Sequence, residues 1–369
     1  LMIKDTARRF ASEVIAPIVE EDEKNHYTRM DIYQQMADMG FFGLVIPEEY
    51  GGSGAGMVSS MLATMEIAKV NASWGLPFNM QTQGPGLAIL RWGTEEQKQK
   101  YVPGLVDGSI LGAFALTEPN AGSDVAGMKT TAREEGDHFV LNGSKTWISN
   151  AQIADICLVY AYTDKSAKHR GMTCFIVDMK NTKGVETRAI DTKLGLHMSP
   201  TGEIFFDDAI IPKENILGEI NQGFKVGMIM LDNTRLSCAA RAVGVGQACI
   251  DASVEYSSER MAFGKSISNF QMIRSDLAVM AVEHEAAKLL VLRAAWQKEE
   301  DPNARNSLEV SMAKYMAAEA AVHAANETVK IFGSYGFSSE YPAERLYRDA
   351  KSFQIVEGTS NIQKIIISN

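Results

Sequence analysis

The sequence predicts an α+β protein in which a block of strands lies between two helical blocks. Three observations predict it. Apolar residues recur at spacings of three and four in the first block, short apolar runs with turn signals fill the second, and long Ala-, Met- and Leu-rich stripes occupy the third. Because 369 residues exceed what one hydrophobic core supports, we expect three domains, at 1–112, 113–215 and 216–369.

The first block is predicted to be helical. Ile32, Met36 and Met39 show the spacing of one helix face, and a similar stripe follows near Met61. The glycine-rich segments 48–54 and 79–86 interrupt the pattern. Helices joined by short loops at these breakers are therefore expected.

The second block is predicted to form a small β-barrel or sandwich. Residues 139–141, an Asn142-Gly143 turn signal and residues 145–149 are typical of a hairpin. Further strands are expected at 157–162, 173–177 and 203–206.

The third block is predicted to be a bundle of long helices. Residues 223–258, 270–298 and 306–333 carry apolar stripes long enough to pack side by side. An antiparallel four-helix bundle is the simplest arrangement for helices of this length. Methionine in such stripes more often fills a core than contacts a cofactor.

Composition excludes several classes of partner. The net charge of −10 argues against nucleic acid, because binding its phosphates requires clustered Lys and Arg. No apolar run approaches the roughly 20 residues that span a bilayer. We therefore expect neither a nucleic-acid nor a membrane partner. The chain opens inside a helix-like pattern, so we also expect the native protein to extend beyond both ends.

Cysteine and histidine usage indicates neither disulfides nor a metal site. The four cysteines include no CxxC pair, and the six histidines show no ligand spacing. Reduced thiols fit a bacterial cytoplasm, or a mitochondrial matrix if the source is eukaryotic.

Glu357 is the candidate general base. It lies between an apolar run and the small residues Gly358, Thr359 and Ser360. Apolar neighbours raise the pKa of a carboxyl group, and glycine allows a ligand to approach the backbone. The alternative is a helix-terminal Glu followed by a capping glycine.

The segment 115–124 is the strongest local candidate for ligand binding. Its Thr117 hydroxyl and backbone amides can bind the edge of a heteroaromatic ring, and Gly122 with Ser123 can hold a phosphate. The alternative is a turn, because Ser, Asp and Asn favour such positions.

Taken together, these segments resemble the signatures of acyl-CoA dehydrogenases. Residues 115–124 and 142–150 are similar to the first signature, residues 259–271 to the helical flavin-contact motif, and residues 357–360 to the catalytic segment. The matches occur in the family's order and cover essentially the whole chain. The resemblance implies the acyl-CoA dehydrogenase fold, non-covalent FAD between the β domain and the bundle, and a homotetramer.

The resemblance also implies individual contacts. Within one chain, the predicted FAD contacts are Phe114, Leu116, Thr117, Gly122, Ser123, Trp147 and Ser149. Those reaching the FAD of a neighbouring subunit are Arg260, Phe263, Gln271 and Lys330, while Thr359 and Asn361 close the site. The predicted substrate contacts are Ser123, Leu231, Asp232, Arg235, Val356 and Gly358.

The implied reaction is α,β-dehydrogenation of an acyl-CoA. Glu357 removes the α-proton, the β-hydrogen leaves as hydride to the flavin, and an electron-transfer flavoprotein accepts the electrons. A short, branched or alicyclic acyl group is expected. The alternatives are the same chemistry on a carrier-protein thioester, a flavin oxidase of the same fold, and a scaffold without activity.

Some positions depart from the family pattern. Lys330 stands where many relatives carry Gln, and Ala262 where Thr is frequent. Val356 replaces the bulky Tyr of several relatives, which suits a wide acyl group or reflects simple size drift. The chain is also similar to bacterial glutaryl- and cyclohexanecarboxyl-CoA enzymes. Because residues 78–83, expected near the acyl tail, include no Arg or Lys, a dicarboxylic substrate is disfavoured.

Overall fold

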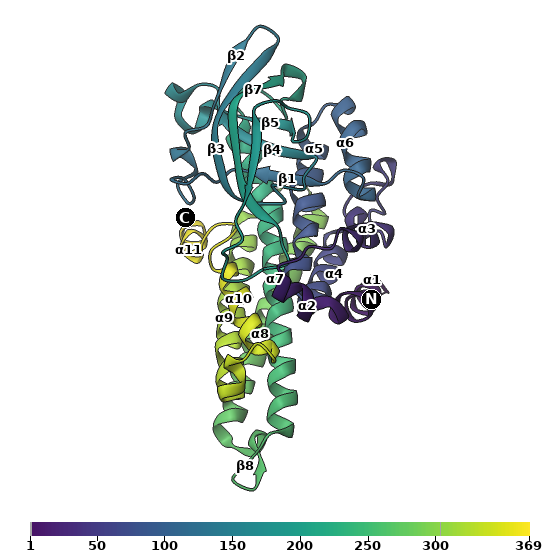
Figure 1. Ribbon diagram of the computed structural model, residues 1–369, viewed down its shortest axis with the longest axis vertical. Helices are drawn as coiled ribbons and strands as arrows, with labels where there is room; N and C mark the ends of the chain where they lie inside the picture. The colour runs from purple at the N-terminus through teal and green to yellow at the C-terminus, as the bar shows by residue number, and fades with distance from the viewer. Residues whose placement is uncertain (1, 303) are drawn as a thin grey trace.

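The computed structural model describes residues 2–302 and 304–369. The strands of the large sheet lie together at one end of the molecule, and the long helices extend away from them to the other end (Figure 1). The order of elements along the chain is helices, strands, helices. The predicted α+β class is confirmed, whereas the domain limits 1–112, 113–215 and 216–369 stay a prediction.

The N-terminal part consists of short α-helices packed around a buried segment, residues 72–86, that contains a 3-10 turn and a π-helix. Its α-helices are α1 (Met2–Phe10), α2 (Val19–Asn25), α3 (Met30–Asp38), α4 (Met57–Val70), α5 (Leu87–Trp92) and α6 (Glu95–Asp107). The 3-10 turn η5 (Ala72–Gly75) and the π-helix η6 (Asn79–Gly86) lie between α4 and α5.

The prediction of a loop at 79–86 is wrong. All eight residues are buried in η6, which runs directly into α5 despite the internal Pro85. Packing against α7 and β1 outweighs the low helix propensity of glycine and proline. Wide π turns of this kind are frequent at functional sites.

The middle part is a single curled sheet of seven strands. They are β1 (Gly112–Ala115), β2 (Thr131–Glu135), β3 (His138–Ser149), β4 (Ile156–Tyr162), β5 (Met172–Asp178), β6 (Val185–Ala189) and β7 (Thr201–Pro212). The order is β1-β4-β2-β3-β7-β6, and β5 pairs with β4. The pairing is mixed, since β1 runs parallel to β4 while β3 and β7 are antiparallel.

The predicted hairpin at 139–149 is also wrong. These residues form one continuous strand, β3, which pairs with β7 along its length. The Asn142-Gly143 pair makes a register shift instead of a turn. The Asn142 side chain forms two hydrogen bonds with Asp208 on β7, which hold the two strands together there.

The C-terminal part contains the long helices α7 (Gly223–Glu259), α8 (Gln271–Glu300) and α9 (Ser307–Phe332). The shorter α10 (Pro342–Phe353) packs on α7 and α9, and α11 (Ser360–Ser368) packs on α9. A small hairpin, β8 (Met261–Ala262) and β9 (Lys265–Ser266), lies at the far tip (Figure 1). Buried alanines line α7 and α9 and let their backbones approach closely.

Helix α7 is the central element because it contacts all three parts. A Cβ at Gly244 would lie 2.5 Å from the Met65 carbonyl oxygen, so α4 crosses α7 at a distance only glycine allows. Near its beginning, α7 packs against β5, and near its middle it packs against η5 and η6.

Several absences concern only the described residues. No helix in that part of the chain is long and apolar enough to cross a membrane. The same residues contain no cluster of three or more metal-ligating side chains. The four cysteines are buried and unpaired.

Candidate active site

Glu357 lies between the end of α10 and the start of α11 and faces α7. Its Oε2 accepts a hydrogen bond from Thr234 Oγ1 at 2.7 Å, and its Oε1 accepts one from Asn79 Nδ2 at 3.3 Å. Thr234 belongs to α7 and Asn79 to η6. Three segments far apart in the sequence therefore fix the orientation of one carboxylate.

The backbone of Glu357 is left-handed, with φ of +56°. Such a conformation costs a non-glycine residue on the order of 1–3 kcal/mol. Arg235 Nε and Gln363 Nε2 each donate to the Glu357 carbonyl at 3.2 Å, and Lys314 Nζ donates to the Gly358 carbonyl at 2.7 Å. Hydrogen bonds from charged donors contribute roughly 1.5–3 kcal/mol each, so these contacts offset the strain.

The environment raises the pKa of Glu357 above its ordinary value. Burial is the largest cause, because it disfavours the charged form. The hydrogen bond from Thr234 and the charges of Arg241, Arg235 and Lys314 oppose it without cancelling it. A carboxylate whose pKa is shifted toward neutrality is suited to accept a proton from a weakly acidic carbon.

The predicted flavin-side segment follows β1 and is organised by a buried ion pair. Glu118 accepts from Lys145 Nζ at 2.9 Å, from the Thr130 N–H at 3.0 Å and from the Lys129 N–H at 2.5 Å. Lys145 Nζ also donates to the Leu116 carbonyl at 3.3 Å. Burial raises the pKa of Glu118, but the charge of Lys145 and the N–H donors outweigh it and lower the pKa.

Trp147 is presented by a β-bulge. The register between β3 and β7 slips by one residue between Lys145 and Ile148, and Trp147 has φ of +60°. Bulges next to sites re-aim a side chain, and this indole is 58% exposed. The backbone of the bulge is tied to the segment after β1, because the Thr146 N–H donates to the Thr117 carbonyl at 3.0 Å.

These residues fit a flavin. A strained, exposed tryptophan lies on a strand bonded to the Leu116–Ser123 loop, and Gly122 and Ser123 are open to solvent. The protein itself does not cover this aromatic surface. Among the predicted contacts on this side, Leu116 is buried, and Phe114, Thr117 and Ser149 are partly buried.

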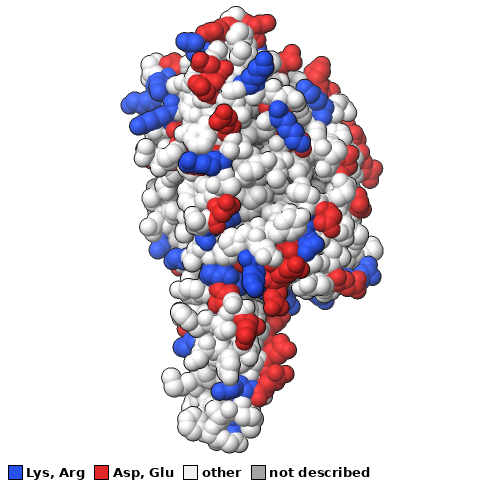
Figure 2. Space-filling view, in the orientation of Figure 1, with Lys and Arg blue, Asp and Glu red and all other residues white. Residues whose placement is uncertain are grey.

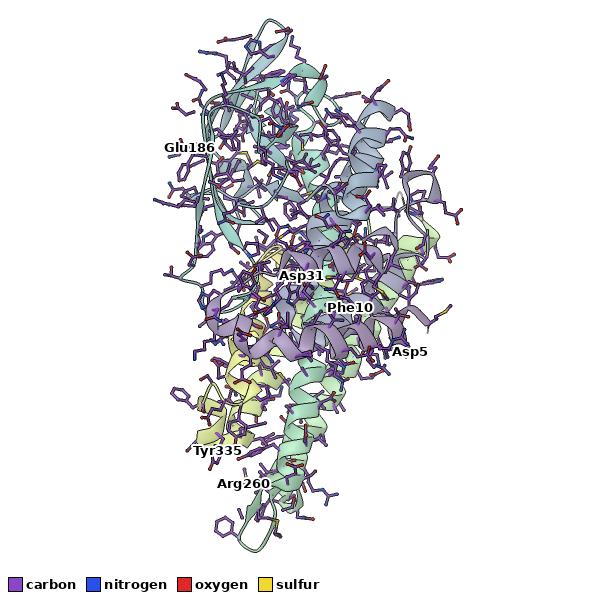
Figure 3. The ribbon with its side chains drawn as sticks, turned by 45° about the vertical axis from the view of Figure 1, so that its right-hand side comes forward. Asp5, Phe10, Asp31, Glu186, Arg260 and Tyr335 are labelled. Carbon is purple, nitrogen blue, oxygen red and sulfur yellow. The ribbon has the colours of Figure 1, made fainter. Side chains whose placement is uncertain are left out.

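The FAD contacts predicted to reach a neighbouring subunit lie at the opposite end of the bundle. Arg260 and Tyr335 are seen together near its tip (Figure 3), and the Arg260 guanidinium lies 5.4 Å from the Tyr335 ring centre. Phe263 is 95% exposed and has φ of +51°. Gln271 is exposed, while Lys330 pairs with Asp276 at 3.0 Å. One chain does not bring this group together with Glu357.

The tip carries an apolar surface. Its exposed large apolar side chains are Met261, Phe263, Met272 and Phe337. Figure 2 shows few charged side chains there on the face it displays. Contiguous exposed apolar surface indicates contact with another molecule.

Asp232 and Arg235 lie inside the protein. Arg235 Nη1 donates to Asp232 Oδ1 at 3.0 Å, and Ser307 Oγ donates to Asp232 Oδ2 at 2.8 Å. Both residues are buried. This geometry makes Arg235 a support for the Glu357 carbonyl, in addition to any contact with a ligand.

The remaining predicted residues lie around Glu357. Thr359 caps α11 by accepting the Ile362 N–H at 3.3 Å. Asn361 and Val356 are exposed, and Leu231 and Gly358 are partly buried.

Sequence reasoning missed several supporting residues. They are Asn79, Glu118, Lys145, Thr234, Arg241, Lys314 and Gln363. Four of them were within reach, because they lie inside segments already singled out in the sequence: Asn79 in 78–83, Glu118 in 115–124, Lys145 in 142–150 and Thr234 in 231–235. Arg241 and Lys314 had no local signal, since each acts on a residue distant in sequence. Gln363 acts on Glu357, six residues before it.

Comparison with known proteins identifies the class. Residues 1–109 match the family "Acyl-CoA dehydrogenase, N-terminal domain", residues 113–209 the middle domain, and residues 221–369 the C-terminal domain. The chain therefore belongs to the acyl-CoA dehydrogenase family, whose members are FAD-dependent oxidoreductases.

Individual relatives are similar over nearly their full length. Glutaryl-CoA dehydrogenase of Desulfococcus multivorans is 47% identical over 370 residues, covering 100% of this chain and 95% of the relative. The caffeyl-CoA reductase-Etf complex subunit CarC of Acetobacterium woodii is 42% identical, covering 100% and 96%.

Solved structures agree. A glutaryl-coenzyme A dehydrogenase in complex with glutaryl-CoA superimposes with a TM-score of 0.97 at 46% identity, covering 100% of this chain and 93% of that one. Butyryl-CoA dehydrogenase of Megasphaera elsdenii gives 0.96 at 39% identity, covering 99% and 96%.

Because Glu118 and Lys145 form a buried ion pair, Glu118→Gln should strongly reduce stability. Removing the carboxylate charge leaves Lys145 buried without its counter-ion, so the unfolding free energy should fall by about 3–5 kcal/mol and FAD retention should decrease. Urea unfolding and the flavin absorbance of purified protein measure both. Lys213→Met, which breaks an exposed pair with Glu134, should change stability by less than about 1 kcal/mol. Equal effects of the two substitutions would contradict the assignment.

Proposed function

We propose that this protein catalyses α,β-dehydrogenation of a short acyl-CoA thioester, branched and alicyclic groups included, with Glu357 as the base. The observation that carries the proposal is the carboxylate of raised pKa held by Thr234 and Asn79. Membership of the acyl-CoA dehydrogenase family supports it.

In the proposed mechanism, Glu357 removes a proton from the α-carbon of the thioester. Thr234 and Asn79 hold its two oxygens in place, and Arg235, Gln363 and Lys314 hold its backbone. In the part of the chain that the structure describes, the N–H of Glu357 donates to no backbone acceptor. It is available to the thioester oxygen, which becomes negative as the proton leaves.

FAD, when bound, supplies the acceptor for the β-hydride. The residues proposed to hold its ring are Phe114, Leu116, Thr117, Trp147 and Ser149, with Gly122 and Ser123 nearby. Thr359 and Asn361 close the site from α11. The thioester is proposed to lie against Ser123, Leu231, Val356 and Gly358, with Asp232 and Arg235 behind it.

Electrons then pass to an electron-transfer flavoprotein. The support is similarity to a subunit of a caffeyl-CoA reductase-Etf complex. A bacterial cytoplasm, or a mitochondrial matrix in a eukaryote, is the proposed location.

Replacing Glu357 should slow the reaction strongly. Glu357→Gln keeps the size of the side chain but removes its proton affinity, so reduction of bound flavin by butyryl-CoA should slow by about 10²–10⁴-fold. Anaerobic stopped-flow absorbance measures this rate. Glu344→Gln, which alters an ion pair with Arg348 on α10, is the control and should react normally. Full turnover by Glu357→Gln would refute the assignment, and flavin bleached only by carrier-protein thioesters would favour that alternative substrate.

The pH dependence should respond to Thr234. Its hydroxyl favours the charged form of Glu357, so Thr234→Val should raise the pKa of Glu357 further. Because the base acts when deprotonated, the rate rises with pH through this pKa. The acidic limb of the pH–rate profile should therefore move to higher pH, and an unmoved or acid-shifted limb would contradict this role.

A second copy of the chain should complete the flavin site. We propose a homotetramer in which Arg260, Phe263, Gln271 and Lys330 reach the FAD of a neighbouring subunit. Light scattering should give the mass of four 40.4 kDa chains, and Phe263→Ser should lower FAD retention. A monomer that keeps its full FAD content would exclude this arrangement.

A further inference from the structure

A buried cation near Glu357 has two nitrogen atoms without a hydrogen-bond acceptor among the described residues, although its charge acts on Glu357 and it lies over the Phe353 ring. Arg241, on α7, is 1% exposed, and its Nε and Nη1 atoms make no hydrogen bond. None of the salt bridges found among the described residues includes it. Burying N–H groups without an acceptor is unfavourable, so these two donors of Arg241 are suited to an anionic acceptor brought by a ligand.

Arg241 lies on the face of α7 that contacts the base. It follows Thr234 by seven residues, which is about two turns and roughly 10.5 Å along the helix axis. Long side chains of a helix lean toward its N-terminus, and here that direction leads to Thr234 and Glu357. The charge of Arg241 lowers the pKa of Glu357, and so favours its charged form, more strongly than the charge of Arg235, whose side chain touches the Glu357 backbone.

The elements around Arg241 are those that hold Glu357. A Cβ at Gly75, in η5, would lie 2.7 Å from Cγ and Cδ of Arg241, so the arginine stem occupies the space of a side chain at position 75. Its guanidinium carbon lies 5.7 Å from the ring centre of Phe353, the last residue of α10. Glu357 is only four residues beyond Phe353.

The difference in burial between Glu357 and Arg241 indicates which of them lies deeper in the protein. Glu357 keeps some exposed surface, whereas Arg241 has almost none. A thioester whose α-carbon meets Glu357 would therefore direct its chain end inward, toward the guanidinium. Ser237, one turn before Arg241, is fully buried and its Oγ also lacks a partner, so a second donor lies on the same stretch of α7.

We propose that Arg241 binds a carboxylate at the far end of the acyl chain, so that the substrate is the CoA thioester of a short dicarboxylic acid. The proposal rests on the proposed function and narrows its substrate class. A guanidinium offers a carboxylate two parallel hydrogen bonds, and Ser237 can donate a third. An apolar chain end would leave these buried donors unpaired, which is how such sites reject uncharged analogues.

The sequence disfavoured a dicarboxylic substrate, whereas the position of Arg241 favours one. Residues 78–83 contain no cation, but α7 supplies one to the same region from a position more than 150 residues later. Gly75 is what makes room for it.

The test compares substrates of matched length on the FAD-loaded enzyme. Anaerobic flavin bleaching is followed with glutaryl-CoA against pentanoyl-CoA, and with adipyl-CoA against hexanoyl-CoA. The native enzyme should prefer the dicarboxylic member of at least one pair by about 100-fold in the apparent second-order rate. Arg241→Gln should lose about 100-fold with that substrate and react equally or faster with its uncharged partner, and Arg241→Lys should retain part of the preference.

Other outcomes overturn the inference in distinguishable ways. A native preference for pentanoyl- or hexanoyl-CoA would refute the carboxylate site and leave the proposed function standing. Equal losses on both members in Arg241→Gln, with a shifted pH–rate profile, would assign Arg241 to Glu357 alone. Bleaching by no acyl-CoA, with FAD bound, would refute the proposed function itself.

A second variant covers the case in which Arg241→Gln does not fold. Gly75→Ala keeps the charge but places a methyl group against the arginine stem. It should reduce the rate selectively with the dicarboxylic substrate, and thermal unfolding with flavin absorbance checks that the variant is intact. An equal effect on both members of a pair would count against the proposal.

Discussion

The placement of one strained turn determines the geometry of this site. Glu357 and the following Gly358 both have positive φ, and their carbonyls accept from Arg235 on α7, Lys314 on α9 and Gln363 on α11. Each donor comes from a different helix. These hydrogen bonds to the turn therefore form only when the helices of the bundle are assembled. In that arrangement the Glu357 carboxylate faces Asn79 on η6.

The same assembly sets the electrostatic environment of Glu357, the proposed base. Burial raises the pKa of Glu357, while Arg235, Arg241 and Lys314 keep it from rising further. Two of these cations are already engaged, Arg235 with Asp232 and Lys314 with the Gly358 carbonyl. Among the described residues, none accepts a hydrogen bond from Nε or Nη1 of Arg241, which distinguishes Arg241 from the other two cations.

The buried ion pair between Glu118 and Lys145 holds the predicted flavin-binding segment in place. Lys145 on β3 joins Glu118 and the Leu116 carbonyl, so the segment after β1 is held against the sheet. This rigid segment and the bulge at Trp147 lie in the strand-rich part, whereas Arg260 and Phe263 lie at the far tip of the bundle. The separation within one chain is the physical reason for expecting a second copy.

The sequence by itself determined the class of the fold and the family, and it also singled out Glu357 as the candidate base, a role that stays a prediction. These follow from periodicity and from local strings such as 115–124 and 357–360, which carry their information in neighbouring residues. The tertiary structure decided the rest. It turned the expected hairpin at 139–149 into one strand because β7 pairs along it, and the expected loop at 79–86 into a buried π-helix because α7 and β1 pack on it. It also brought Asn79, Thr234 and Arg241 to the region of Glu357, since contacts between residues more than 100 positions apart have no local pattern to reveal them.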